Sequence, residues 1–279
     1  MRPRQTDTQP LPTFVPAGPI EPATWVRAHG IEVLVPSADQ VVTPYMKRKR
    51  EWDGTVLSAV LDSLSPTSSF LDVGAMVGYF STVVAKKIPR GTVVAVEPLR
   101  ANLELASLNL SNFDNTLLLE GAVTNSPELA WSVVPDDGNR GNTRVGVDRV
   151  AGSIAPHVTT ATLHDLVRHF RSDVVKIDVQ GMEKDVLGSL DVSGKLPRNL
   201  TLFCEITPSQ WRDDREILAA IRQFQSAGFD AYFLTEANAY STFTPARLER
   251  LVNVGSSWVD HFDMIITRGR YAATIRGRA

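Results

Sequence analysis

The stretch from Phe70 to Phe80, FLDVGAMVGYF, constrains the fold of this chain more than any other segment. An apolar run meets an acid, Asp72, and two glycines four residues apart precede a second apolar run. This order is typical of a buried parallel strand that turns sharply into a helix, because glycine lets the backbone turn tightly and approach a ligand closely. The first N–H groups of the helix then face the space above the strand end. The stretch therefore predicts a site for a nucleoside-containing cofactor.

From Phe70 onward, strand-like apolar runs alternate with helical segments, which predicts a parallel sheet covered by helices on both faces. The predicted fold class is α/β, with a doubly wound, mostly parallel, seven-stranded sheet of the Rossmann-like kind. We expect the strands of the chain at residues 70–73, 92–96, 116–119, 131–134, 174–177, 200–203, 229–234 and 264–267. A partly helical cover is expected at 235–260, before the last strand.

The segment before Phe70 is predicted to be an N-terminal extension. Its first part is proline-rich and predicts a disordered or extended lead with nothing to pack. Its second part predicts a hairpin that turns at His29-Gly30, followed by one helix from Tyr45 to Leu64. The predicted organisation is a lead at 1–24, a hairpin and helix appendage at 25–69, a cofactor-binding catalytic domain at 70–270 and a tail at 271–279.

Composition excludes several classes of protein. A formal net charge of -2 gives no electrostatic case for nucleic-acid binding. A single cysteine, Cys204, excludes an internal disulfide framework and an all-cysteine metal cluster. No apolar stretch has the length needed to span a bilayer, and the N-terminus is too rich in proline and polar residues for a secretory signal. We therefore expect a cytoplasmic protein without a nucleic-acid or membrane partner.

Acids or glycines stand at five predicted strand ends, where ligands bind in open parallel sheets. These residues are Asp72 with Gly74, Glu97, Gly121, Asp178 and Glu205. Glu97 lies nineteen residues beyond Gly78 and directly follows a strand, so its carboxylate can accept both ribose hydroxyls of a nucleoside. Glu97 could also be an acid at the N-terminus of the next helix, where the helix dipole favours negative charge, and this role is compatible with ribose binding.

The glycine spacing distinguishes between two cofactors. A nicotinamide dinucleotide site requires G-x-G-x-x-G, but Met76 occupies the position of the middle glycine. The carboxylate of Asp72 would repel a diphosphate, whereas it would pair with the ammonium group of an amino acid. The pattern from Asp72 to Gly78, followed by Glu97, therefore predicts S-adenosylmethionine rather than NAD.

The sequence resembles the FkbM-type methyltransferases, a branch of the class I S-adenosylmethionine-dependent fold. The stretches that carry this resemblance are LDVGAMVGYFS (71–81), VVAVEPLRANLELASLNLSN (93–112), EGAV (120–123), TLHDLV (162–167), VVKIDVQGMEKDVL (174–187) and CEITP (204–208). The resemblance implies a sheet whose last strand is antiparallel. It also implies methyl transfer, usually to a hydroxyl of a sugar or secondary metabolite, and hence natural product biosynthesis.

The resemblance also implies residue roles. Asp72, Gly74 and Gly78 would hold the methionine part, Glu97 the ribose, and Gly121 with Ala122 the adenine edge. The full predicted cofactor-binding set is Asp72, Gly74, Ala75, Gly78, Glu97, Pro98, Gly121 and Ala122. Two positions depart from the family pattern: Gln180 replaces the usual Glu of K-I-D-x-E-G, and Met76 stands where Asn is common. The first departure puts a family-wide account of catalysis in doubt.

An alcohol acceptor must lose a proton during methyl transfer, and Asp178 and Glu205 are the candidate catalytic bases. A cap for the next helix is the alternative role of Asp178. The two acids could contribute to a Mg²⁺ site, but no third acid is placed for it, and no metal is predicted. The predicted acceptor contacts are Asn139, Arg140, Asn142 and Arg144, in a polar loop at 136–146, with Tyr240 and Trp258 in the later cover.

The predicted activity is O-methylation of a small-molecule hydroxyl. Methylation of an amine or a carboxylate is an alternative, because neither needs a strong base. A non-catalytic adenosyl-binding module is a further alternative, against which the intact Asp72, Gly74, Gly78 and Glu97 argue.

Overall fold

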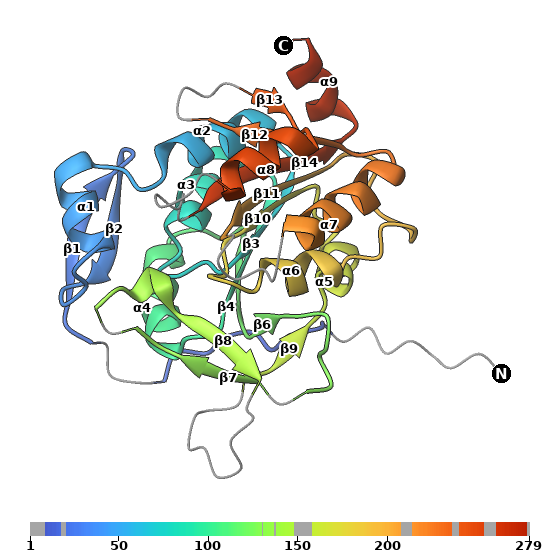
Figure 1. Ribbon diagram of the computed structural model, residues 1–279. Helices are drawn as coiled ribbons and strands as arrows, with labels where there is room; N and C mark the ends of the chain where they lie inside the picture. The colour runs from blue at the N-terminus through green and yellow to red at the C-terminus, as the bar shows by residue number, and fades with distance from the viewer. Residues whose placement is uncertain are drawn as a thin grey trace.

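A mostly parallel sheet forms the centre of the computed structural model, which describes residues 9–17, 21–129, 131–136, 138–147, 158–207, 214–235, 240–253 and 261–277. The strand order is β13-β12-β14-β11-β10-β3-β4-β5 (Figure 1). The strands are β3 (Ser69–Val73), β4 (Thr92–Glu97), β5 (Thr116–Glu120), β10 (Val174–Ile177), β11 (Leu200–Ile206), β12 (Asp230–Leu234), β13 (Tyr240–Thr242) and β14 (Phe262–Arg268). The last strand, β14, runs antiparallel to both neighbours, as predicted. The α/β fold class is confirmed, with the short β13 added at one edge.

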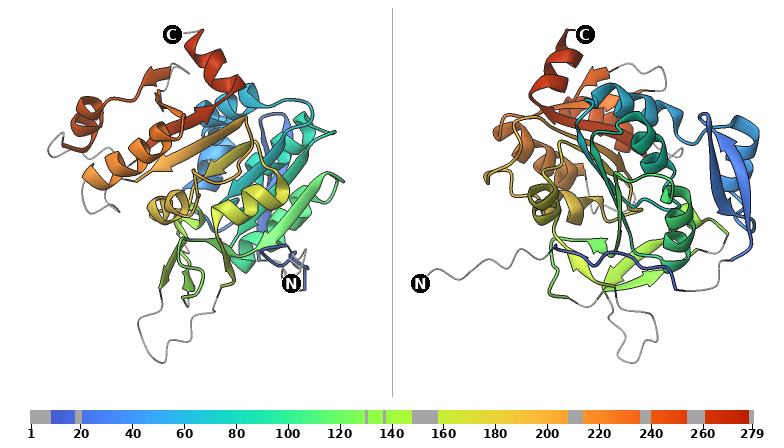
Figure 2. Two further views of the ribbon diagram at one scale, coloured as in Figure 1. Left: turned by 90° about the vertical axis from the view of Figure 1, so that its right-hand side faces the viewer. Right: turned by 180° about the vertical axis from the view of Figure 1, so that it is seen from behind.

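Successive side chains of each strand point to opposite faces of this sheet, and both faces are buried. In β3, for example, Phe70 and Leu71 enter two different hydrophobic clusters on opposite sides. Helices α5 (Leu163–Phe170), α6 (Glu183–Gly188) and α7 (Asp214–Ser226) cover one face. Helices α2 (Gly54–Ser63), α3 (Tyr79–Lys87), α4 (Arg100–Leu110) and α9 (Arg270–Arg276) cover the other (Figure 2). Within the described chain, no helix combines the length and apolar character needed to cross a bilayer.

The predicted N-terminal hairpin is present. Strands β1 (Ala23–Ala28) and β2 (Ile31–Pro36) pair antiparallel, so that Ala28 faces Ile31. The turn residues His29 and Gly30 both have positive φ, at 47° and 74°, which is the backbone of a tight two-residue hairpin turn.

The single helix predicted from Tyr45 to Leu64 is wrong. The chain forms α1 (Val42–Lys49) and α2, separated by residues 50–53, of which Arg50 and Asp53 lie in the left-handed region. The carboxylate of Asp53 accepts a hydrogen bond from the N–H of Val56 at 3.4 Å and so caps α2. Apolar periodicity continues through this break, but an Asp followed by Gly is a helix-start signal that outweighs it.

The proline-rich lead is extended where the structure describes it, but the expectation that it has nothing to pack is wrong. The N–H of Phe14 donates to the carbonyl of Leu118 in the edge strand β5 at 2.8 Å. The side chains of Leu11 and Phe14 are buried. At the other end, the segment expected as a tail holds most of α9, in which Tyr271 and Ile275 are buried.

Two loops contain more regular structure than the sequence predicted. The loop at 136–146 includes a 3₁₀ turn (Arg140–Asn142) and β8 (Arg144–Val147), which pairs with β7 (Trp131–Val134). A second small sheet follows β5 in the chain: β6 (Ala122–Val123) pairs with β9 (Thr160–Ala161) in parallel. The cover after β12 contains β13 and α8 (Pro245–Asn253), while Trp258 lies outside the described residues.

The turn after β3 depends on the missing side chain of Gly74. Its φ is +82°, and a Cβ there would collide with the backbone carbonyl oxygen of Asp178 at the end of β10. Gly228 has the same φ of +82°, but a Cβ there would meet nothing within 4 Å. The two positions therefore separate the cost of backbone conformation from the cost of the collision.

We predict that Gly228→Ala lowers the free energy of unfolding by about 1–2 kcal/mol, the cost of a Cβ in the left-handed region. Gly74→Ala should cost clearly more, because β3 and β10 would have to separate. Urea unfolding of both variants measures this difference. Equal losses would show that the close backbone approach at Gly74 does not contribute.

Candidate functional site

A cavity of about 570 Å³ lies at the carboxyl ends of β3, β4, β10 and β11, with α1 and the 139–145 segment as its other wall. Small-molecule sites typically span about 300–1,000 Å³. The predicted site residues that line it are Asp72, Gly74, Ala75, Glu97, Pro98, Gly121, Ala122, Asn139, Arg140, Asp178 and Glu205. Gly78 and Asn142 do not line it. Strand ends distant in sequence thus converge on one cavity.

The turn between β3 and α3 forms the floor of this cavity. The N–H groups of Gly74 and Ala75 both donate to the carbonyl of Val96 at 3.0 Å. Met76 has a φ of 50°, in a region where Asn is several-fold enriched, so the departure from the common Asn places a less suited residue in a strained turn.

Gly78 does not line the cavity but sets the backbone at the start of α3. It is the N-cap of α3 with a φ of 76°. A Cβ at this position would lie 3.4 Å from the Cβ of Ala106 in α4. That distance is an ordinary van der Waals contact, so the preference for glycine at this position comes from the left-handed backbone at the start of α3.

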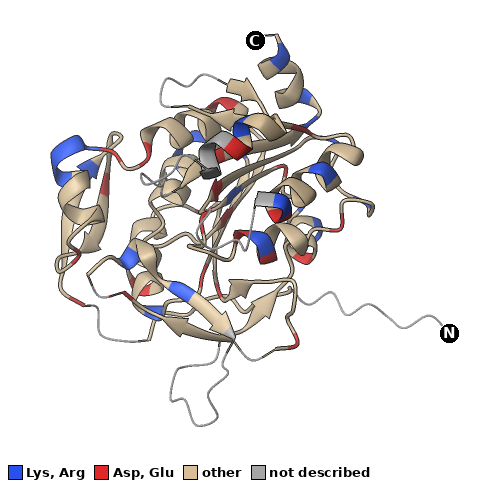
Figure 3. Ribbon diagram, viewed as in Figure 1, with Lys and Arg blue, Asp and Glu red and all other residues tan. Residues whose placement is uncertain are grey.

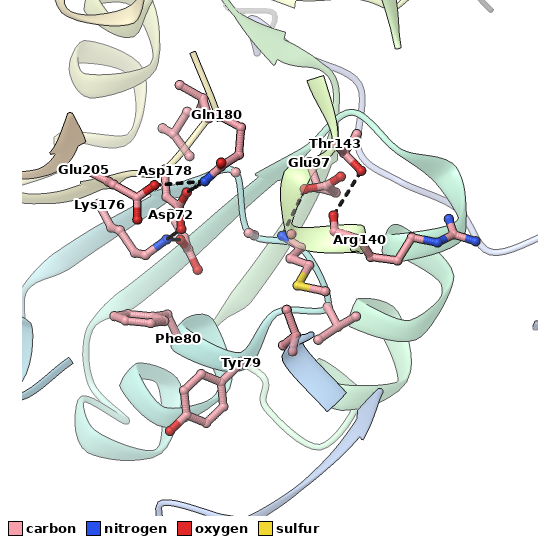
Figure 4. A pocket seen from close by; sticks show the side chains of 18 of the residues that line it. Asp72, Tyr79, Phe80, Glu97, Arg140, Thr143, Lys176, Asp178, Gln180 and Glu205 are labelled. Carbon is pink, nitrogen blue, oxygen red and sulfur yellow. Dashed lines mark hydrogen bonds and ion pairs between the residues drawn. The ribbon is translucent and has the colours of Figure 1, made fainter. Parts of the chain in front are cut away.

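Glu97 is almost fully buried and already accepts three hydrogen bonds. Its Oε2 accepts from the N–H of Met76 at 2.9 Å (Figure 4). Its Oε1 accepts from the N–H of Leu99 at 3.0 Å and from the amide of Asn102 at 3.1 Å. Burial raises the pKa of Glu97 to about 7, although these donors lower it. Because a carboxylate oxygen can accept twice, Oε2 keeps one position for a ligand hydroxyl.

Lys176 is a buried cation between two acids of the cavity. Its Nζ lies 3.0 Å from Oδ2 of Asp178 and 4.0 Å from Oδ1 of Asp72, and 4.8 Å from the centre of the Phe80 ring. Burial lowers the pKa of Lys176, but the carboxylates of Asp178 and Asp72 outweigh burial, so the pKa is raised. The lysine is therefore held in its charged form.

Asp72 is fully buried on the α3 side of the sheet. Its Oδ2 accepts a hydrogen bond from the hydroxyl of Ser81 at 2.7 Å. Its Oδ1 has no hydrogen-bond partner among the described residues, and burial raises the pKa of the carboxyl. The ammonium of Lys176 lies 4.0 Å from Oδ1, too far for a hydrogen bond, so this buried oxygen keeps an acceptor position that fits the ammonium group of S-adenosylmethionine.

Gln180 joins the two candidate bases. Its amide nitrogen donates to Oδ1 of Asp178 at 2.8 Å and to Oε1 of Glu205 at 2.9 Å (Figure 4). A glutamate in this position would place a third carboxylate between two others, whereas the amide supplies a donor to both. Burial, followed by the charges of Asp178 and Asp263, raises the pKa of Glu205 to about 9.

One buried carboxylate fastens the opposite wall. Oδ1 of Asp39 accepts from the N–H groups of Val41 and Thr43 at 3.0 Å, at the start of α1. Oδ2 of Asp39 accepts from the N–H of Arg140 at 2.8 Å. Asp39 therefore holds α1 and the 139–145 segment together across about a hundred residues of chain.

The predicted acceptor contacts are arranged differently from the expectation. The guanidinium of Arg140 forms an ion pair with Glu21 at 2.7 Å and points away from Asp178 and Glu205 (Figure 4). The side chain of Asn142 donates to Asp136 at 3.0 Å. Tyr240 shares a hydrogen bond with Tyr271 at 3.0 Å. Asn139 and Arg140 line the cavity. The side chains of Arg140, Asn142 and Tyr240, however, bind other residues of the protein.

The sequence interpretation missed Lys176 and Asp39. A signal existed for Lys176, because it stands two residues before Asp178 in β10 and so shares its face of the sheet. No local pattern marks Asp39. Within the described parts of the chain, no group of three or more His, Cys, Asp or Glu side chains is placed to hold a metal ion.

We predict that Asp39→Ala weakens binding of S-adenosylhomocysteine about tenfold, because losing about 1.4 kcal/mol of wall stabilisation corresponds to that factor. Thr162→Ala is the control: it removes the N-cap of α5, which accepts from the N–H of Asp165 at 3.0 Å, away from the cavity. Both variants should lose about 1–2 kcal/mol of stability. Equal affinities in calorimetry would contradict a role for Asp39 in the cavity wall.

We also predict that Glu97→Ala weakens cofactor binding about 10–100-fold, the usual value of a hydrogen bond to a charged group. Glu120, opposite Glu97 in the register of β4 and β5, does not line the cavity, so Glu120→Ala is the matched control. Glu97→Gln keeps one side-chain oxygen as an acceptor, and so tests whether the turn at Met76 stays folded without the carboxylate. Unchanged calorimetric affinity in Glu97→Ala would refute the ribose assignment.

Comparison with known proteins identifies the family. Residues 72–231 match the methyltransferase FkbM domain. No curated protein matches the chain. Similar solved structures include a precorrin-6y C5,15-methyltransferase from Geobacter metallireducens GS-15, at 15% identity and a TM-score of 0.41, covering 77% of this chain and 88% of that one.

Two further solved structures are an rRNA methylase from Streptococcus thermophilus (13% identity, TM-score 0.39, 77% of this chain and 95% of that one) and M. jannaschii TYW2 in complex with AdoMet (10% identity, TM-score 0.41, 90% and 87%). Likenesses this distant say nothing about the substrate of this chain. The match to the family model, in contrast, covers more than half of the chain. The chain belongs to the FkbM methyltransferase domain family and is an S-adenosylmethionine-dependent methyltransferase.

Proposed function

We propose that this enzyme methylates a hydroxyl group of a small molecule, as part of natural product biosynthesis. The observation that supports this most directly is the pair of carboxylates, Asp178 and Glu205, at neighbouring strand ends in the cavity wall. Gln180 bridges them, and Lys176 forms an ion pair with Asp178. Such a pair can orient an alcohol and receive its proton.

The two acids have different roles in this proposal. Asp178, paired with a buried lysine, is the carboxylate that accepts the hydroxyl proton. Glu205, whose pKa is raised to about 9, holds its own proton at neutral pH and donates a hydrogen bond to the acceptor. S-adenosylmethionine, when bound, supplies the electrophilic methyl group. Asp72 and Glu97 hold its ammonium and ribose, and alignment of the reactants provides most of the rate.

The size and charge of the site support a small acceptor over a nucleic acid. The cavity is about 570 Å³ and carries several carboxylates. Lysine and arginine are spread over many elements in Figure 3, with a group at the end of α1 (Lys47, Arg48 and Lys49). A net charge of -2 provides no general attraction to phosphates. A cytoplasmic location stays an expectation from the sequence.

Methylation of an amine is the second candidate, and Gln180 favours it. The amide removes one charge that the family usually places beside the acceptor. Mass spectrometry of the product distinguishes the two candidates, because an O-methyl ether and an N-methylamine fragment differently.

We predict that Asp178→Asn lowers kcat about 10²–10⁴-fold, the usual contribution of a positioned base, while the affinity for S-adenosylhomocysteine is retained. Asp114→Asn, a variant of an exposed acid outside the cavity, is the control. The assay measures transfer of labelled methyl groups to the best acceptor of a panel of hydroxylated metabolites. Loss of cofactor binding in parallel with activity would mean that Asp178 is structural.

A further inference from the structure

Four aromatic side chains line one part of the cavity, although they come from three different segments. They are Tyr45 in α1, Trp52 in the segment before α2, and Tyr79 and Phe80 at the start of α3. We call these four residues the aromatic cluster. Tyr79 and Phe80 are buried, whereas Tyr45 and Trp52 are only partly buried. The cluster therefore gives the cavity an apolar surface beside its carboxylates.

Edge-to-face contacts hold the rings of the cluster in place. The ring centres of Tyr45 and Trp52 are 5.3 Å apart with 83° between the planes, and those of Tyr79 and Phe80 are 5.8 Å apart with 87°. This is a preferred geometry of aromatic pairs. Burial raises the pKa of Tyr79 to about 12, while the N–H of Trp52 lowers it, so the two pairs meet where this hydroxyl lies close to the Trp52 backbone.

Trp52 belongs to the cluster because the helix breaks on both sides of it. In one continuous helix, the backbones of Tyr45 and Trp52 would lie about 10 Å apart along the axis. Instead, Arg50 and Asp53 adopt φ values of 58° and 46°, and the chain brings the two rings into contact. Left-handed backbone is unfavourable for residues other than glycine, and such strain is concentrated at ligand sites.

The aromatic cluster reaches the candidate base. The centre of the Phe80 ring lies 4.8 Å from Nζ of Lys176, which is 3.0 Å from Oδ2 of Asp178. Figure 4 shows Phe80 beside Lys176, with Tyr79 beyond it. The residues predicted to hold ribose and adenine stand at the ends of β4 and β5, on the other side of β3 from β10. The cluster therefore lies on the acceptor side of the cavity.

Polar side chains on the cavity wall are already engaged with the protein. The amide of Gln180 donates to Asp178 and Glu205, and the guanidinium of Arg140 pairs with Glu21. A sugar would place several hydroxyls against the aromatic cluster, and a polar group that leaves water without a new partner is costly. This part of the cavity therefore favours an acceptor with few hydroxyls and a flat, apolar body.

The chemistry of the candidate base favours an acidic hydroxyl. A carboxylic acid ordinarily has a pKa of about 4, a phenol such as that of tyrosine about 10, and water about 16. An alkyl alcohol is about as weak an acid as water. A carboxylate such as that of Asp178 therefore takes the proton of a phenol far more readily than that of an alkyl alcohol.

We propose that the acceptor is a phenol whose ring packs against the aromatic cluster, with its hydroxyl at Asp178. This rests on the proposed function, because the cavity must be the acceptor site. The phenol oxygen bonds to the methyl carbon as the bond from that carbon to sulfur breaks. The electron pair of the broken bond stays on sulfur, and the phenol proton passes to Asp178. The products are an aryl methyl ether and S-adenosylhomocysteine.

The direct test compares phenols with their saturated counterparts in calorimetry at pH 7, with saturating S-adenosylhomocysteine. The pairs are 2-naphthol with decahydro-2-naphthol, and 4-ethylphenol with 4-ethylcyclohexanol. The saturated alcohols are at least as apolar, so a preference for the phenol does not come from hydrophobicity. At least one phenol should bind about fivefold or more tightly than its counterpart, because only a flat ring makes the aromatic contacts.

Two tryptophan variants show whether the cluster causes this preference. Trp52→Leu should weaken binding of the preferred phenol about 2–10-fold and change binding of its saturated counterpart less than about twofold. Trp25→Leu is the matched control and should keep the preference, because Trp25 is 57% exposed on β1 and does not line the cavity. Tyr45→Leu tests the same pair of rings from its other member, and thermal unfolding verifies that each variant is folded.

The outcomes separate this inference from the proposed function. If neither phenol binds better, or if Trp52→Leu and Tyr45→Leu both keep the preference, the inference is wrong, whereas methylation of a saturated alcohol or a sugar would still support the proposed function. Faster methylation of the saturated alcohol than of the phenol would also overturn the inference alone. If 4-aminophenol is methylated on nitrogen, the proposed function is overturned and the phenolic acceptor with it. Methylation on its oxygen supports both.

Discussion

The close approach of two backbones, at Gly74 after β3 and at the carbonyl of Asp178 after β10, is the constraint on which the site depends. It brings the cofactor turn beside the strand end that carries the candidate base. The same pairing of β3 with β10 sets Asp72 opposite Lys176 in register. A side chain at position 74 would separate these strands, and with them the ion pair of Lys176 with Asp72 and the cavity floor.

Buried charge is the second constraint. The buried Lys176 lies between Asp72 and Asp178, and buried charged groups persist only when they are paired. Gln180 then supplies a neutral donor to Asp178 and Glu205, where another acid would add repulsion. The charge of Lys176 also acts on Glu205 and Asp263, but burial outweighs it and raises the pKa of both carboxyls. The wall therefore contains more carboxylates than cations, as is common at functional sites, where stability is lost in favour of binding.

The wall opposite the strand ends belongs to the N-terminal segment as much as to the sheet. Asp39 joins α1 to the 139–145 segment, and Glu21 holds Arg140. Even the proline-rich lead contributes, because Leu11 packs where a side chain on Gly121 would stand. The residues before Phe70 are consequently part of the architecture that shapes the cavity, although the family match begins only at residue 72.

Local pattern determined the alternating strands and helices, the turn at Gly74 and the acids at the strand ends, because parallel strands place their carboxyl ends on one edge. It could not separate α1 from α2, since apolar periodicity runs through Arg50 and Asp53. Contacts such as Asp39 with Arg140, or Glu205 with Asp263, join residues far apart in the chain, and no local pattern encodes them. The sequence alone determined the cofactor and the strand ends that line the cavity. Only the tertiary structure decided which charges meet there, because strand register fixes which side chains become neighbours.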